Sequence, residues 1–197
     1  MSRLMVFGIA LILIIVSGCA LNSNAITFEQ GVKRINEMDE KFGATIKTPP
    51  NSTENIDSLL AELTGFSAVN KDIPLLLSYL LDFKIKMLEA EKLHTEGWQW
   101  DKASTTEYGF GCKKGSARIL NSSKIRNASA YKGYEAIEAL QLLVDEFPNE
   151  AKGLDLSQKD VLFLNAAYQQ VEDKAIKDAK IVRSLCKEQI EKLNITI

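Results

Sequence analysis

Histidine and proline are scarce in this chain of 197 residues, which has one histidine and four prolines. A single histidine excludes most His-based catalysis and most histidine metal sites. Four prolines and eleven glycines are too few for a long disordered linker. The net charge of −2 leaves no surplus of Lys and Arg to bind a nucleic-acid phosphate backbone. We therefore expect one ordered domain with no nucleic-acid partner.

Common catalytic and cofactor motifs are also missing. The sequence contains no Cys-x-x-Cys, His-Glu-x-x-His, Gly-x-Ser-x-Gly or phosphate-binding GxxxxGK pattern. Glu91 and His94 have the Glu-x-x-His spacing of ferritin-like di-iron bundles, but such a site needs a second pair and further glutamates. We interpret His94 as a surface or helix-end residue, and we predict no catalytic residues, no metal and no cofactor. An enzyme with a carboxylate-based site is the remaining catalytic hypothesis.

The first eighteen residues have the pattern of an export signal. Arg3 precedes the mostly aliphatic run Leu4–Val16, which is shorter than the ~20 residues of a membrane span. The sequence that follows, Val16-Ser17-Gly18-Cys19, resembles the lipobox of prokaryotic membrane lipoproteins. That resemblance implies a lipid-modified Cys19 at the start of the mature chain, anchored to the cell membrane on its extracytoplasmic side. An uncleaved N-terminal anchor is the alternative, and it gives almost the same location.

The sequence therefore divides into three parts. Residues 1–18 are the predicted signal peptide, 19–26 the lipidated cysteine with a short tether, and 27–197 a single helical domain. A tether of this length spans at most ~25 Å, so the domain should lie close to the membrane. One acyl chain binds a membrane only weakly, so lasting attachment implies more than one chain on Cys19.

Apolar residues recur at helical spacing through most of the domain, and no stretch alternates as a strand would. The run from Asp72 to Glu96 is apolar on nearly every side in its first half, which is typical of a helix surrounded by other helices. We predict an all-α, up-and-down bundle of about five helices with one long loop rich in glycine and aromatic residues. The predicted helices cover residues 27–43, 52–66, 72–96, 123–147 and 157–193.

The predicted loop, from Gly97 to about Ser122, combines several glycines with the aromatic residues Trp98, Trp100, Tyr108 and Phe110. Such aromatic side chains either close the open end of a bundle or form a stacking platform for a sugar or another flat ligand. The second interpretation predicts a small-ligand-binding lipoprotein with a pocket under residues 97–115.

Between Glu107 and Glu135 the chain has no acidic residue, so all charged residues in this segment are cations. Two of them, Lys124 and Arg126, fall in the first turn of a predicted helix, where they oppose the helix dipole. This placement suggests an anionic partner, whereas the alternative is a solvated basic rim balanced by acids of other helices. A partner surface predicts that Lys113, Lys114 and Arg126 are exposed and that binding weakens with salt. The candidate cations are Lys113, Lys114, Arg118, Lys124, Arg126 and Lys132.

Two cysteines remain once Cys19 is assigned to lipid. An even remainder in an exported protein favours a disulfide, here Cys112–Cys186, because alternating helices bring both to the membrane-distal end. Two buried thiols, or a reactive Cys112, are the alternatives. The same topology places four Asn-x-Ser/Thr triplets at that end, as potential glycosylation sites in an organism that glycosylates exported asparagines. They begin at Asn51, Asn121, Asn127 and Asn194.

Together these patterns predict a lipid-anchored cell-envelope protein that acts as a non-catalytic binding or scaffold module. Its partner would be an envelope protein or an anionic envelope polymer, bound by the region from Trp98 to Lys132. The alternative is the small-ligand-binding lipoprotein with a pocket under the aromatic loop.

Overall fold

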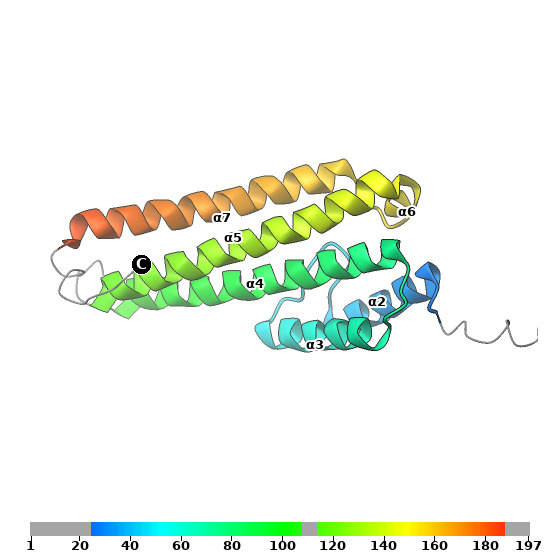
Figure 1. Cartoon of the computed structure of the whole chain (residues 1–197). Helices are drawn as coiled ribbons and strands as arrows, with labels where there is room; N and C mark the ends of the chain where they lie inside the picture. Colours follow the sequence, from blue (N-terminus) through cyan, green and yellow to red (C-terminus); the bar gives the residue numbers. More distant parts are fainter. Residues whose placement is uncertain (1–24, 108–113, 188–197) are drawn as a thin grey trace, which may run out of the picture.

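The computed structural model describes residues 25–107 and 114–187, and these ranges contain helices and no strand. The predicted all-α class is therefore confirmed. The helices, labelled in Figure 1, are α2 (Phe28–Phe42), α3 (Thr53–Val69), α4 (Leu75–Glu107), α5 (Lys114–Glu146), α6 (Pro148–Gly153) and α7 (Gln158–Leu185).

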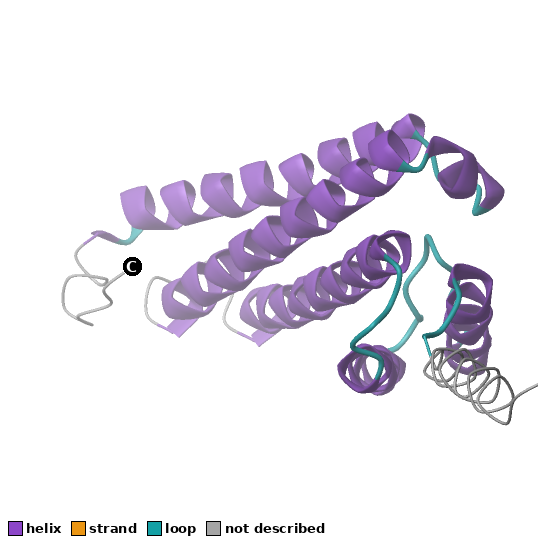
Figure 2. Ribbon diagram, turned by 45° about the vertical axis from the view of Figure 1, so that its right-hand side comes forward, coloured by secondary structure: helices purple, strands orange, loops and turns teal. Residues whose placement is uncertain are grey.

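Three long antiparallel helices form the body of the bundle. α5 packs against α4 on one side and against α7 on the other. α3 packs on α4, and α2 contacts both α3 and α4 (Figure 2). Helices α2 and α3 cover only the part of α4 near its start (Figure 1). The ion pair between Asp57, near the start of α3, and Lys92 shows that α3 begins beside the middle of α4.

Helix α2 begins and ends where the sequence predicts. The Thr27 hydroxyl accepts from the Gln30 amide at 3.3 Å, and Gln30 Oε1 accepts from the Thr27 amide at 3.0 Å, which completes the capping box. Gly43, at φ +70°, ends the helix in the left-handed conformation that glycine adopts without strain. Helix α4 starts at Leu75 rather than at Asp72, since Pro74 O accepts the first helical bond, from the Ser78 amide at 3.0 Å.

The hydrophobic core is centred on the first half of α4, as its all-round apolar sequence predicts. Leu77, Leu80, Phe83 and Leu88 are essentially inaccessible to solvent, and they pack with Ile35 of α2 and with residues of α3 and α5. Burying a side chain of this size contributes about 1.5–3 kcal/mol relative to leaving it exposed.

The predicted loop over residues 97–122 is mostly helical, which corrects its boundaries. α4 continues to Glu107 and α5 already begins at Lys114, so only residues 108–113 separate them, and these lie outside the described ranges. Gly97 is buried inside helix α4. A Cβ at this position would lie 2.6 Å from Cγ of Arg126, so the close packing leaves no room for a side chain. This glycine therefore marks a close helix crossing rather than a helix break.

Two serines of α5 fix its alignment on α4. Ser122 Oγ donates to the Gly97 carbonyl at 2.8 Å, and Ser129 Oγ donates to the Ala90 carbonyl at 2.7 Å. Each pair of positions is seven residues, or about two helical turns, apart. Small residues at these positions let the two backbones approach closely, and both hydroxyls find a partner although they are buried.

A similar close approach joins α5 to α7. A Cβ at Gly133 would lie 2.3 Å from the ring of Tyr168, so the ring occupies the space that glycine leaves. Burial raises the pKa of Tyr168 to about 12, with a further contribution from the charge of Glu91. Within the part of the chain that the structure describes, no helix has the length and apolar character needed to cross a membrane.

Candidate functional site

The described members of the predicted binding set lie on α4 and α5 and differ in exposure. Trp98 and Trp100 project from α4 and are 47% and 38% exposed. Lys124 is exposed on α5, and Arg118 is partly exposed there. Tyr108, Phe110 and Lys113 lie outside the described residues, and the structure describes the backbone of Lys114 but not its side chain.

Arg126 contradicts the expectation of an exposed cation, because it is only 1% exposed. Its Nη2 donates to Asp178 Oδ2 of α7 at 2.7 Å, and Lys174 Nζ lies 3.3 Å from the same oxygen. Burial alone would raise the pKa of Asp178, but the bond from Arg126 and the charge of Lys174 outweigh it and lower that pKa. Since α5 starts at Lys114, Arg126 lies in the helix interior, and the dipole argument for an anionic partner no longer applies.

Trp98, on α4, contacts the lysine of this cluster, Lys174. Its Nε1 donates to His94 Nε2 at 2.9 Å, and Lys174 Nζ lies over its ring at 5.6 Å from the centroid. His94 is half-buried rather than a surface residue, and its buried Nδ1 has no hydrogen-bond partner. Burial lowers its pKa, the charge of Glu91 opposes this effect, and the charge of Arg126 adds to it. Trp98 is thus fixed on a helix by neighbours on α4 and α7.

Lys132 is also neutralised by acids of its surroundings. Its Nζ lies 2.9 Å from Glu135 and 3.3 Å from Glu89 of α4, and Lys86 of α4 contacts the same two carboxylates. The hydrogen bond to Glu135 is the main cause that raises the pKa of Lys132. For Lys132 and Arg126 the run of cations is balanced by other helices, as the alternative interpretation expected.

The two cysteines and the four Asn-x-Ser/Thr triplets were predicted to lie at one end of the bundle, and this prediction holds only in part. Ile119 and Leu120 at the start of α5 pack with Val182 and Cys186 at the end of α7. Cys112 lies outside the described residues, so the Cys112–Cys186 bond stays a prediction. Asn51 is not at that end, because it precedes the first turn of α3, which lies beside the middle of α4. The remaining triplets begin on α5 at Asn121 and Asn127, and outside the described residues at Asn194.

A fully buried ion pair, which the sequence analysis missed, joins α2 to α4. Lys84 is 0% exposed and Asp39 is 2% exposed, and Lys84 Nζ lies 3.0 Å from Asp39 Oδ1. Lys84 also donates to the carbonyl of Thr45. Burial raises the pKa of Asp39 and lowers that of Lys84, and the charge of each partner opposes the effect. A lysine within the largely apolar first half of α4 was the signal for such a partner.

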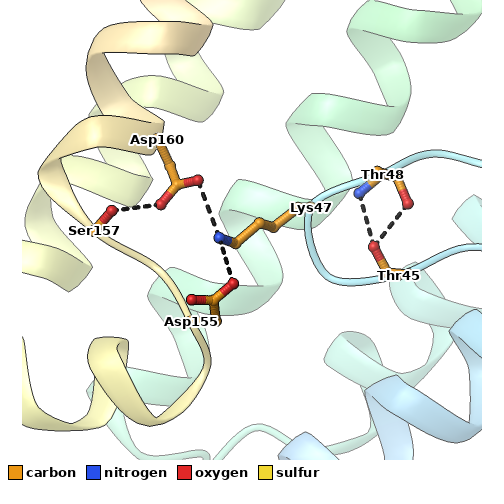
Figure 3. Close-up of polar contacts among 6 residues, drawn as sticks. All are labelled: Thr45, Lys47, Thr48, Asp155, Ser157 and Asp160. Atoms are coloured by element: carbon orange, nitrogen blue, oxygen red, sulfur yellow. Dashed lines mark hydrogen bonds and ion pairs between the residues drawn. The ribbon is translucent and has the colours of Figure 1, made fainter.

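A second electrostatic contact ties the segment between α2 and α3 to the turn between α6 and α7 (Figure 3). Lys47 Nζ lies 2.9 Å from Asp155 Oδ2 and 3.1 Å from Asp160 Oδ1. Ser157 Oγ donates to the other Asp160 oxygen at 2.7 Å (Figure 3). The hydrogen bond to Asp155 is the main cause that raises the pKa of Lys47.

Next to these contacts an open groove runs along α2, which we call the α2 groove. It consists of two adjoining cavities of about 590 and 350 Å³ that share Asn36, Glu40 and Leu154. Its floor is apolar and its rim is mostly acidic. The first cavity is lined by Phe28, Glu29, Val32, Lys33, Asn36, Glu37, Glu40, Glu150, Gly153 and Leu154. The second adds Asp39, Ala44, Thr45, Ile46, Lys47 and Asp155.

Sequence reasoning did not predict this groove, because its two walls are more than a hundred residues apart in the chain. No protein-family model matches the chain, and no curated protein or solved structure matches it either. What the protein does is therefore inferred from its own residues.

Proposed function

We propose that the protein is an exported lipoprotein of the cell envelope, anchored through Cys19, whose helical domain is a non-catalytic binding or scaffold module for an envelope protein. The lipobox-like sequence Val16–Cys19 supports export and anchoring. Helix α2 begins at Phe28, so the tether keeps the start of α2 within ~25 Å of the membrane.

The observation that carries a non-catalytic role is how the buried charges are used. Among the described residues, the buried charged side chains are Asp39, Lys84 and Arg126, and each contacts an opposite charge on another helix. A catalytic acid or base must instead reach a substrate. These charges align helices within the bundle, which favours a scaffold that presents surfaces to a partner.

The partner is more consistent with a protein than with an anionic polymer. Arg126 and Lys132, two of the cations expected to face a polymer, contact carboxylates of the domain itself. The small-ligand alternative has less support as well. It required an irregular loop over residues 97–115, and most of that range belongs to α4 and α5.

Lipidation and partner binding are tested in the organism's own cells. Metabolic labelling with an alkyne-bearing fatty acid should modify the wild-type chain and not Cys19→Ser. A photoreactive amino acid at Asn36 or Trp98 should give a discrete protein adduct, whereas the outward-facing Gln170 should give none. Membrane-bound protein that forms no adduct at either Asn36 or Trp98 would refute the binding role, and an unlabelled wild-type chain would refute the anchor.

We also propose the Cys112–Cys186 disulfide. Cys186 packs beside Leu120, a few residues along the chain from Cys112, which supports the pairing. The bond would close a loop of roughly 74 residues, for which chain entropy gives about 4 kcal/mol of stabilisation. Protein isolated with its thiols trapped should gain two alkyl groups only after reduction, as measured by mass spectrometry. Two alkyl groups before reduction would contradict the pairing.

A further inference from the structure

We propose that the α2 groove binds a short helical segment of a partner protein, with Lys or Arg on one face and apolar side chains on the other. This inference rests on the proposed function, since it names the surface and the class of partner for the binding module. It follows from the length of the groove, its floor and its charge.

The groove matches the dimensions of a helix. Phe28, Val32, Asn36 and Glu40 recur every four residues, so they line one face of α2 along nearly its whole length. Twelve residues of helix rise about 18 Å, and a partner helix of similar length would lie alongside. Helix-in-groove recognition uses this arrangement, with apolar anchors at successive turns of the bound segment.

The floor offers apolar side chains that the domain itself covers only in part. Phe28, Val32 and Leu154 pack against the edge of the core and remain partly accessible. They come from both walls, since Phe28 and Val32 belong to α2 and Leu154 follows α6. Apolar anchors of a partner would cover what these side chains leave open, and this burial would supply much of the affinity.

The charge of the rim selects a cationic partner. Glu29, Glu40 and Glu150 form no ion pair with any described residue, whereas Glu37 is paired with Arg34. Lys33 is the single cation in the lining of the larger cavity. The rim therefore has a surplus of negative charge along the whole length of α2, and lysines spaced over about three turns of a helix would complement it.

A buried carboxylate adds an independent observation at the smaller cavity. Asp39 lines the smaller cavity although it is 2% exposed, and its Oδ2 has no hydrogen-bond partner. Lys84 lies near the other oxygen, Oδ1. An unpaired acceptor in such a position costs free energy unless a donor reaches it. The ammonium or guanidinium group of an inserted side chain is a donor of the right charge.

The proposal is tested with the full chain in a non-ionic detergent and a fluorescent peptide of about fourteen residues that places Lys and Leu on opposite helix faces. Fluorescence anisotropy measures binding. We expect E29Q/E40Q/E150Q to weaken binding about tenfold, because three exposed ion pairs with the peptide, each of modest strength, are lost together. Lys33→Glu should strengthen binding about threefold by the same reasoning.

The matched control removes three exposed acids from other surfaces, D82N/E96Q/E138Q, and should bind as the wild type does. The detergent background is the same in all variants, so the comparison isolates the groove. Equal affinities for the two triple variants would overturn the proposal, as would tighter binding of a peptide with Glu in place of Lys. So would a dimer that dissociates in E29Q/E40Q/E150Q, because the occupant would then be a second copy of the chain.

The two levels of inference fail separately. If adducts form in cells at Trp98 and the two triple variants bind the peptide equally, the groove proposal is wrong and the binding role stands. If the peptide distinguishes the variants but no adduct forms in cells, the proposed function is wrong and the chemistry of the groove stands.

Discussion

Replacing Asp39 with Asn should destabilise the protein strongly, because it leaves a charged Lys84 without a carboxylate in the core. Lys84 is completely inaccessible and Asp39 nearly so. Removing one member of such a pair costs about 3–5 kcal/mol, a large part of the total stability of ordinary domains. For a chain of this size, that corresponds to a fall in melting temperature of about 6–20 °C.

The two single substitutions and the double one should not add. Lys84→Met leaves Asp39 buried alone, whereas D39N/K84M removes both charges and replaces them with uncharged side chains of similar size. The double variant should therefore be more stable than either single variant, as expected when a buried ion pair is replaced as a unit.

The pH dependence of the single variants should have opposite signs. In Lys84→Met, burial raises the pKa of Asp39, so the folded chain binds more protons than the unfolded one and gains stability as pH falls from 7 toward 4. In Asp39→Asn, burial lowers the pKa of Lys84, so the unfolded chain binds more protons in the alkaline range and stability rises as pH increases toward 10.5.

Urea unfolding followed by circular dichroism measures all of these changes. The matched control is the pair formed by Lys92 and Asp57, which lie 2.7 Å apart with side chains 44% and 49% exposed. Asp57→Asn should cost less than about 1 kcal/mol, because water screens exposed pairs. If Asp39→Asn costs no more than Asp57→Asn, or if the slopes with pH share one sign, the assignment of a buried ion pair is wrong.

Two further substitutions test the helix crossings by the same unfolding assay. Gly97→Ala should destabilise by about 1–3 kcal/mol because its Cβ would meet the Arg126 side chain, whereas Gly65→Ala, which meets nothing within 4 Å, should stabilise by up to about 1 kcal/mol. Asp178→Asn should cost about 3 kcal/mol and Arg126→Met less, because only the first leaves a buried charge unpaired. The contribution of Asp178 should disappear as pH falls below its unfolded pKa near 3.8, because its folded pKa is lower still.

The features that could be predicted from sequence are those with local causes. The capping box of Thr27 and the left-handed Gly43 depend on residues within one turn, and both helix ends lie where they were predicted. The central place of α4 followed from its own apolar run, since a helix apolar on nearly every side is stable only among other helices.

The failed predictions depend on partners far away in the chain. We predicted a helix break at Gly97 because glycine is equally suited to a turn and to a close helix crossing. The side chain that packs against Gly97, Arg126, comes from the next helix. We predicted that Arg126 is exposed because its neighbours in sequence are basic. Its counterion, Asp178, lies far away in the chain, on α7. Sequence pattern around either residue cannot reveal such a contact.

The α2 groove could not be predicted for the same reason. One residue beside it, Lys84, did indicate a buried partner from sequence alone. The pattern of α2 shows an inner face and an acidic face, but not that the turn after α6 lies opposite. The lysine at position 84, in the largely apolar first half of α4, did point to a buried acid, because lysine is almost never fully buried without a partner. Finding Asp39 as that partner required the fold.

The electrostatic contacts explain why the groove has a defined shape. The pair of Asp39 and Lys84 fixes α2 on α4, and Lys47 fixes the segment after α2 against the turn that follows α6 (Figure 3). Each wall is thus anchored by a charge contact with a geometry that apolar packing alone does not impose, because hydrophobic burial is non-directional. Buried pairs add little stability relative to apolar residues of the same size, so their role is better explained as alignment. A module that recognises a helix by shape and charge needs its two walls at a fixed separation, and the buried pair aligns one wall from inside the domain while Lys47 contacts the other wall at the surface.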